Sequence, residues 1–432
     1  MNFEPLQSFR QEVYRLLSRA RDATFELMDA VMTTKHASSI AEFSLSPMFR
    51  RQYPSTYEAL EDCRPQRNQA MKLFISRIPT QKYLTLAIDH TPWPRPEAKT
   101  LKDRTYEHQG KTKQGIVIGQ GYSTIAWLPD GEGSWALPLR HERITSWESP
   151  ISKAVWQLKQ VLKHCQQKVI VLLDREYGNA KWVLATAELK DVDCVMRIRS
   201  NACLYGIPPI YSGSGRPCKH GQKFQLTDSV TWTEADSILE LTDPICGQVR
   251  VKMWTQLHFQ GAAKNQVNLI RVFRLSPLKS GRMMPPLWVV WTGERIISLA
   301  EIWNQYLRRF GIEHWYRFIK QRLHWTMPSL KTPAQCERWS DLMPLMTWQL
   351  WLARDLVTQY RLPWQSAKID LSPGRVAQSI FTLLVEIGTP AIAPKLRGKS
   401  TGRAIGYKCT PRTRYPVAKK TYSQPKKSQQ TA

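Results

Sequence analysis

The chain has 432 residues, with 62 Lys and Arg against 35 Asp and Glu, and its formal net charge is +27. This excess of cations favours a polyanionic partner over a small-molecule substrate. No apolar stretch reaches the ~20 residues of a membrane-spanning helix, and the start of the chain lacks the apolar segment of a signal peptide. The eight cysteines contain no C-x-x-C pair, so we expect a reduced, cytoplasmic setting without a zinc site.

Residues 1–78 are expected to be helical. Apolar side chains keep helical spacing from Phe9 to Val31, and two further helices are predicted over Ser55–Leu60 and Arg67–Ile78. Arginines on this segment favour a DNA-binding domain, with an ordinary helical bundle carrying a charged outer face as the alternative. These arginines are Arg10, Arg15, Arg19, Arg21, Arg50 and Arg51.

Two short apolar runs, Tyr83–Ile88 and Val169–Leu173, each stop at an aspartate, Asp89 and Asp174 respectively. Fully apolar runs of this length are typical of central strands that are buried on both faces. An acid directly after such a strand lies at the rim of a sheet. Taken alone, either aspartate could equally form a turn or cap a helix.

Residues 79–203 combine these runs with further strands and two helices. The additional elements are predicted over Gly115–Ile118, Tyr122–Trp127, Ser134–Leu139, Ile151–His164, Ala180–Leu189 and Cys194–Arg199. Strands and helices follow one another in a βββαβα order, which predicts an α/β layered fold.

A mainly β insertion domain is predicted over residues 204–294, between Asp174 and the next long helix. Its strand-like runs are Phe224–Leu226, Val249–Thr255, Gln266–Phe273 and Leu287–Trp291. Trp254 and Trp291 lie in this insertion and are candidates for stacking on a flipped base.

Residues 295–365 are predicted to contain one helix over Leu299–Arg322 and a covering helix over Gln335–Val357. On the first helix, four polar side chains fall within an arc of roughly 60°, at about 100° per residue. They are Tyr306, Arg309, Glu313 and Lys320. A carboxylate beside a phenol and two cations suits a metal ion next to a phosphodiester, because the cations and the phenol can bind phosphate oxygens.

Asp89, Asp174 and Glu313 could converge on one or two Mg²⁺ ions, since hard divalent cations prefer oxygen ligands. Taken alone, Glu313 would be interpreted as a surface ion-pair residue between Arg309 and Arg317.

Other titratable residues compete for roles near these acids. Asp103 and Glu176 lack a position at the end of a predicted strand. His90 and His314 neighbour the acids, and we expect them to form hydrogen bonds rather than to bind Mg²⁺.

Residues 366–432 form a basic C-terminal region. From Lys395 to Ala432 there are 11 Lys and Arg and no acid, so we expect a disordered tail that contacts DNA.

Three motifs stand at the positions described above. They are Ile88-Asp89-His90-Thr91, Asp174-Arg175-Glu176-Tyr177-Gly178 and Tyr306-x2-Arg309-x3-Glu313-x6-Lys320. Together they resemble the motifs of bacterial DDE insertion-sequence transposases with the Y-(2)-R-(3)-E-(6)-K signature. Shorter stretches that are similar to this group are Gly119–Ser123, Leu139–Arg143, Arg197–Asn201 and Arg414–Val417. The resemblance extends from about Asp89 to the C-terminus.

The resemblance implies an RNase H-like catalytic core and cut-and-paste transposition. It implies that Asp89, Asp174 and Glu313 hold two Mg²⁺ or Mn²⁺ ions and carry catalysis. Arg309 and Lys320 are then expected to bind DNA phosphates, and Tyr306 to bind a phosphate or orient Arg309.

The expected partners are double-stranded DNA, as element terminal inverted repeats and as target, and a second copy of the chain in a synaptic dimer. The expected location is the bacterial cytoplasm, in association with the nucleoid.

Two other functions stay open at this point. One is a non-catalytic, domesticated DNA-binding protein or inactive element remnant, which the complete set of acids disfavours. The other is a repair or recombination nuclease on the same core, which the insertion and the basic tail disfavour. Joining of DNA ends would separate a transposase from such a nuclease.

Overall fold

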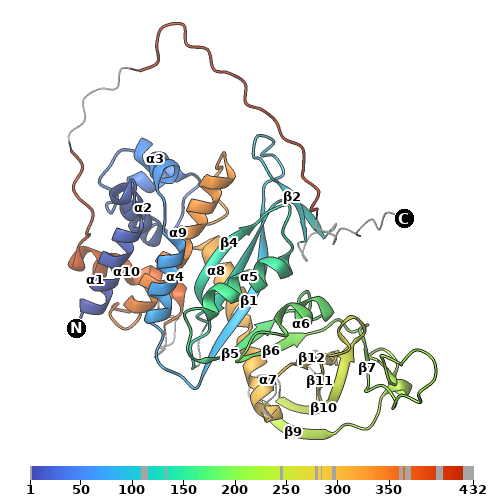
Figure 1. Cartoon of the computed structure of the whole chain (residues 1–432). Coiled ribbons are helices and arrows are strands. Elements are labelled where there is room, and N and C mark those ends of the chain that lie inside the picture. The colour runs from blue at the N-terminus through green and yellow to red at the C-terminus, as the bar shows by residue number, and fades with distance from the viewer. Residues whose placement is uncertain are drawn as a thin grey trace.

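The computed structural model describes residues 2–108, 115–131, 134–243, 247–277, 281–283, 285–293, 298–359, 363–364, 371–395 and 402–421. In this part of the chain the fold is mixed α/β, and its strands form one sheet of twelve strands with mostly antiparallel pairing. Helices pack on the sheet at both ends of the molecule (Figure 1).

The N-terminal segment is helical, as predicted. It contains α1 (Glu4–Leu16), α2 (Arg21–Thr33), α3 (Pro54–Asp62), α4 (Arg67–Ser76) and a short 3₁₀ helix (Ile40–Leu45). Proline 54 stands in the first turn of α3, where its missing N–H has no helical partner to lose. These helices pack against α9 (Pro333–Ala353) and α10 (Pro373–Ile387).

Three of the six arginines that were candidates for DNA contact form ion pairs with acids inside this helical segment. Arg10 is buried and bonds Asp29 at 2.8 Å. Arg50 and Arg51 both pair with the buried carboxylate of Glu26, at 2.6 Å and 2.5 Å. A buried carboxylate needs a paired cation, so these three charges stabilise the fold rather than face DNA.

The first part of the sheet is built from six strands. They are β1 (Tyr83–Pro94), β2 (Thr105–His108), β3 (Ile116–Trp127), β4 (Leu137–Ile144), β5 (Lys168–Leu173) and β6 (Val192–Arg197). β1 pairs with β5 and β5 with β6 in parallel, whereas β2, β3 and β4 pair antiparallel. The parallel strands are the apolar runs because both of their faces are covered.

Helix α5 (Pro150–Leu162) covers part of this sheet, and α6 (Ala180–Thr186) follows β5. The start of α5 is fixed by a capping box, in which Ser149 and Ser152 each bond the backbone of the other. On its inner side, the Gln157 side chain accepts a hydrogen bond from Ser123 Oγ at 2.7 Å.

The insertion is mainly β, and its strands continue the core sheet. It contains β7 (Cys203–Tyr205), β8 (Lys223–Gln225), β9 (Ser237–Asp243), β10 (Gly247–Phe259), β11 (Val267–Arg274) and β12 (Leu287–Trp291). β12 pairs with β6 through Val289↔Arg197, Val290↔Met196 and Trp291↔Val195. Backbone hydrogen bonds therefore join the insertion to the parallel strands, and Figure 1 shows both parts on one twisted sheet.

The long helix predicted over Leu299–Arg322 is two helices, α7 (Leu299–Arg308) and α8 (Phe310–Gln321). The break falls at Arg309 and not at the glycine that is its weakest helix former. Around the break, the N–H groups of Arg309 and Ile312 bond the carbonyls three residues earlier, at 3.1 Å and 3.2 Å. These i→i−3 bonds make a short 3₁₀-type turn between α7 and α8.

The C-terminal tail is extended between residues 402 and 421, and its end returns to the core near β2 (Figure 1). Tyr415 N–H bonds the Lys99 carbonyl at 2.9 Å, and Ala418 N–H bonds the Arg104 carbonyl at 2.7 Å. Lys420 pairs with the buried Glu107 at 2.7 Å. Disorder was expected from the composition, but these contacts anchor residues 415–421, while 396–401 and 422–432 lie outside the described residues.

Within the described residues, no helix is long and apolar enough to cross a membrane.

Candidate active site

Asp89 and Asp174 are neighbours because of strand register. The last parallel pair of β1 and β5 is Ile88↔Leu173, and each aspartate follows directly. β5 ends at Leu173, directly before Asp174, as predicted. β1 instead continues to Pro94, paired with β3, so the prediction that a strand ends at Asp89 was wrong. What ends there is the parallel pairing, and this is sufficient to bring the two carboxylates to the same rim.

Both aspartates are oriented by backbone N–H groups. Asp89 Oδ1 accepts from the N–H of His90 at 2.8 Å, and Asp174 Oδ1 accepts from the N–H of Glu176 at 2.8 Å. The pKa of Asp89 is raised to about 6, chiefly by burial and also by the Asp174 charge, although His90 and Arg309 act in the opposite direction. Both side chains are half-buried, and a cation beside two neighbouring carboxylates favours their charged forms.

In this structure the cation beside them is Arg309. Its side chain is 4% exposed and forms an ion pair with Glu313. Burial opposes its charge, but Tyr306, Asp89, Glu313 and Asp174 raise the pKa of Arg309 above its ordinary value. The Nε and Nη1 groups of Arg309 are buried and have no hydrogen-bond partner among the described residues. Buried donors without partners indicate an anion or a rearrangement in the working state.

The four polar residues of the predicted helix face are divided between two helices. Tyr306 lies buried on α7, Arg309 is at the break, and Glu313 and Lys320 lie on α8. Burial raises the pKa of Tyr306. The Glu313 side chain is 46% exposed, so it remains accessible from solvent.

Lys320 approaches the same strand from α8. Its Nζ donates to Thr91 Oγ1 at 2.6 Å, two residues beyond Asp89. Burial lowers the pKa of Lys320 to about 8, although the Asp89 charge acts in the opposite direction. A phosphate bound beside Lys320 would raise the pKa of the amine again, because a nearby negative charge favours the protonated form.

Sequence reasoning missed Tyr316, which fixes α8 against β1. Its Oη donates to the backbone carbonyl of Asp89 at 2.8 Å and lies 2.8 Å from Thr124 Oγ1. Its position three residues after Glu313 was the available signal, because such residues are neighbours on a helix surface.

His90 and Glu176 form a pair at the edge of the site. His90 Nε2 lies 3.3 Å from Glu176 Oε2, and His90 Nδ1 lies 3.0 Å from Tyr177 Oη. His90 thus forms hydrogen bonds, in agreement with its expected role, and Glu176 is its partner. Asp103, the other competing acid, forms an ion pair with Arg143.

The acids alone do not form a closed metal centre. Among the described residues, no three His, Cys, Asp or Glu side chains gather closely enough to hold an ion. Asp89 and Asp174 are adjacent, while Glu313 is held by Arg309. The donors are carboxylate oxygens only, and this chemistry fits Mg²⁺ or Mn²⁺ rather than a softer metal.

The two tryptophans proposed for base stacking are in the interior of the insertion. Trp254 is 3% exposed and donates to the Thr233 carbonyl, and Trp291 is 2% exposed. Neither ring can meet a base without unfolding its surroundings, so the prediction was wrong. Tryptophan in a strand-like run is most often part of the core.

A family model described as DDE superfamily endonuclease matches residues 12–256, more than half of the chain. The chain belongs to the DDE superfamily of endonucleases. The matched range contains Asp89 and Asp174 and ends before Glu313. Membership in this family implies a transposase-like nuclease with DNA as its substrate. A comparison with curated proteins finds no match.

Proposed function

We propose that this DDE endonuclease is a bacterial insertion-sequence transposase that cleaves the ends of its element and joins the 3′-OH ends to target DNA. The observation that supports the proposal is the register of β1 and β5, whose last parallel pair, Ile88↔Leu173, directly precedes Asp89 and Asp174. Asp89, Asp174 and Glu313 would hold two Mg²⁺ or Mn²⁺ ions. When bound, such ions activate water or a 3′-OH and stabilise the leaving oxygen.

Arg309 acts in this proposal as an exchangeable cation. In the free protein it neutralises Glu313, and Asp89 and Asp174 raise its pKa from nearby. Release of Glu313 leaves the guanidinium with its unpartnered Nε and Nη1 groups free to bind a DNA phosphate. The same movement makes the Glu313 carboxylate available beside the two aspartates.

Lys320 and Tyr306 complete the phosphate-binding side. Lys320 Nζ already lies at Thr91 on the strand of Asp89, so a phosphate at the acids is within reach of the ammonium. Tyr306 is buried beside Arg309 and orients the guanidinium through its ring and hydroxyl. The proposed DNA partners are the terminal inverted repeats and the target duplex, bound by a dimer during synapsis.

The test is incubation of purified protein with DNA carrying the ends of its own element and Mg²⁺. We expect nicking at the element ends followed by strand transfer. Asp174→Asn, which keeps the shape of the side chain, should remove both activities and leave DNA binding intact. Cleavage without any joined product would instead support a repair or recombination nuclease, and binding without cleavage in the wild type would support an inactive DNA-binding protein.

A further inference from the structure

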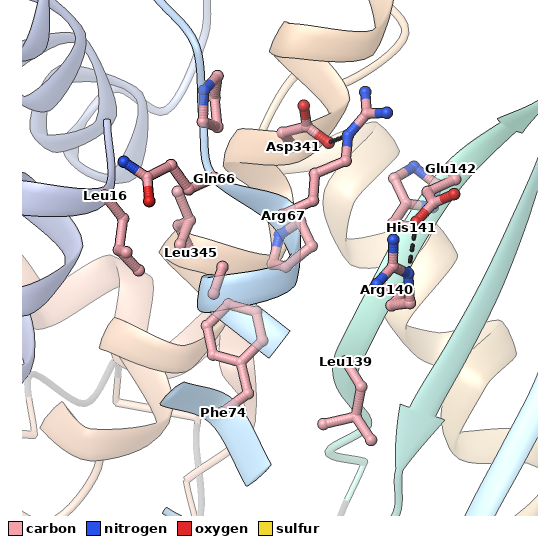
Figure 2. Close-up of a pocket in the computed structure, with 13 residues that line it drawn as sticks. Leu16, Gln66, Arg67, Phe74, Leu139, Arg140, His141, Glu142, Asp341 and Leu345 are labelled. Atoms are coloured by element: carbon pink, nitrogen blue, oxygen red, sulfur yellow. Dashed lines mark hydrogen bonds and ion pairs between the residues drawn. The ribbon is translucent and has the colours of Figure 1, made fainter. Parts of the chain in front are cut away.

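A groove of about 600 Å³ lies between the N-terminal helices and the edge of the sheet. It is lined by the start of α4, strand β4, helix α5 and the start of α9. Figure 2 shows a smaller pocket that shares several of these residues, with Arg67 extending to Asp341 and Arg140 meeting Glu142.

Acids at this groove are already neutralised from within the protein. Arg67 bonds Asp341 at 2.6 Å and Glu337 at 3.2 Å. Arg140 bonds Glu142 at 2.5 Å. These pairs are explained by the fold alone, because a buried carboxylate requires a partner.

Two further arginines at the groove have a different environment. Arg64 Nη1 donates to the Glu61 carbonyl at 2.9 Å, and Arg338 Nη1 donates to the Leu60 carbonyl at 3.0 Å. Within the described part of the chain, neither guanidinium forms an ion pair with a carboxylate. Backbone carbonyls fix their positions without cancelling their charge, so the groove keeps two ordered cations for an anion.

An exposed tryptophan stands at the same groove. Trp156 on α5 is 41% exposed and lines the groove. The Arg140 guanidinium lies 4.8 Å from the centre of its ring, and Lys153 Nζ lies at the same distance. These cations hold the indole in place while leaving part of it open to solvent. Ordered cations beside an open aromatic ring are the components of a nucleic-acid groove.

The groove and the acids lie on opposite faces of the same sheet. Arg140 pairs with Ile125 on β3, and Ile125 pairs with Ile88, the residue before Asp89. Two strand spacings of about 4.8 Å place the backbone of Arg140 roughly 10 Å from that of Ile88. Successive residues of a strand point to opposite faces, so Arg140 shares a face with Ile88, whereas Asp89 points to the other face.

We propose that this groove is a DNA-binding surface on the face of the sheet opposite the acids, with phosphates on Arg64 and Arg338 and an unpaired base stacked on Trp156. The proposal rests on the proposed function only in taking DNA as the ligand. It gives the base-stacking role to a tryptophan that the structure exposes, in place of the two that it buries.

The first experiment measures the salt dependence of DNA binding without divalent metal. The probe is a labelled duplex of about three helical turns. Each phosphate contact contributes about −0.9 to the log–log slope, so Arg64→Ala with Arg338→Ala should make the slope shallower by about 1.8. Lys72→Ala with Lys190→Ala removes equal charge at exposed positions outside the groove and should leave the slope unchanged. An equal change in both double variants, or in neither, overturns the phosphate assignment.

The second experiment uses the same duplex with a short single-stranded end. Trp156→Ala should weaken its binding about tenfold and leave the blunt duplex unaffected, because stacking needs an unpaired base. Trp156→Phe keeps a ring and should retain most of the affinity, while Trp147→Ala is the matched control for an exposed tryptophan. Equal losses on both probes would overturn the stacking role. Because both experiments omit metal, they stay informative if the protein proves unable to cut or join DNA.

Discussion

The two halves of the sheet differ in how their central strands pair and in how deeply those strands are buried. β1 and β5 pair in parallel and are buried almost throughout, whereas β9 alternates between half-buried and exposed residues in an antiparallel arrangement. Parallel strands end at the same edge, so acids that follow the last paired residues meet without help from a loop. Antiparallel strands end at alternate edges. The proposed chemistry is therefore in the parallel half, although the insertion contributes a large share of the strands.

The largest expected effect comes from an acid of the parallel half. Asp174→Asn should lower the cleavage rate on the order of 10⁴-fold. In the proposed site the three acids hold the metal ions together, so the loss of one carboxylate removes the function of the set. DNA affinity should stay unchanged. Asp236→Asn removes an exposed acid of the insertion and is the matched control, with a cleavage rate equal to wild type. A comparable loss in both variants would show that the two halves share the chemistry.

The next effect tests whether the halves fold as one unit. Val290 is fully buried and pairs with Met196 across the junction of β12 and β6. Val290→Asp buries an unpaired charge and should lower the free energy of unfolding by about 4 kcal/mol. Denaturation followed by tryptophan fluorescence and circular dichroism should show one shifted transition.

Ile238→Asp is the control for this junction, because Ile238 is 57% exposed on β9. It should change the free energy of unfolding by less than about 0.5 kcal/mol. Two separate transitions in Val290→Asp, with one at the wild-type midpoint, would mean that the insertion folds independently of the parallel half.

A tryptophan of the insertion provides a somewhat smaller effect. Trp254→Ala should lower the free energy of unfolding by about 3 kcal/mol, since the ring is buried against neighbouring aromatic side chains. The folded fraction should bind DNA with unchanged affinity. A selective loss of affinity for DNA with unpaired ends would restore the base-stacking role that burial excludes.

The smallest effect is a pH dependence at Lys320. Burial lowers its pKa to about 8, so its charge is lost as pH rises through this value, and a metal-free DNA complex should weaken up to about tenfold between pH 7 and 9. Lys320→Arg should remove this pH dependence because a guanidinium stays charged.

The stability of the free protein should respond to Lys320 in the opposite direction. Its folded-state pKa lies below the ordinary value of 10.5, so the folded state gains stability as pH rises from about 8 to 10.5. Lys320→Met should lack this gain. The same pH dependence of DNA affinity in wild type and Lys320→Arg would remove Lys320 from the phosphate-binding set.

Much of the architecture could be predicted from periodicity. The apolar runs before Asp89 and Asp174 are buried parallel strands, and the alternating pattern of residues 204–294 gave strands. Continuity between β6 and β12 could not be predicted, because backbone pairing across a long insertion leaves no local signal. The N-terminal arginines were assigned to DNA because composition does not show which carboxylate each one meets in the fold.

The members of the candidate site stay a prediction, and the local geometry around them differs from the single helix that was expected. Glu313 and Arg309 are spaced as expected, yet the helix breaks between Tyr306 and Glu313. Propensity favoured Gly311 as the weak point, but Gly311 is closely packed, and an added Cβ would lie 3.2 Å from the Leu128 side chain. Tertiary contacts override propensity at such positions. The short contacts that dock Tyr415 and Lys420 were equally hidden in a basic, low-complexity tail.

The break at Arg309 divides one long segment into two helices, α7 and α8, that contact different halves of the sheet. α7 is tied to the insertion, where Trp303 Nε1 donates to Asp243 at 2.9 Å, and α8 is tied to β1 through Tyr316. Arg309 therefore links a helix that contacts the insertion to a helix that contacts the strand of Asp89, and its ion pair with Glu313 lies at this junction.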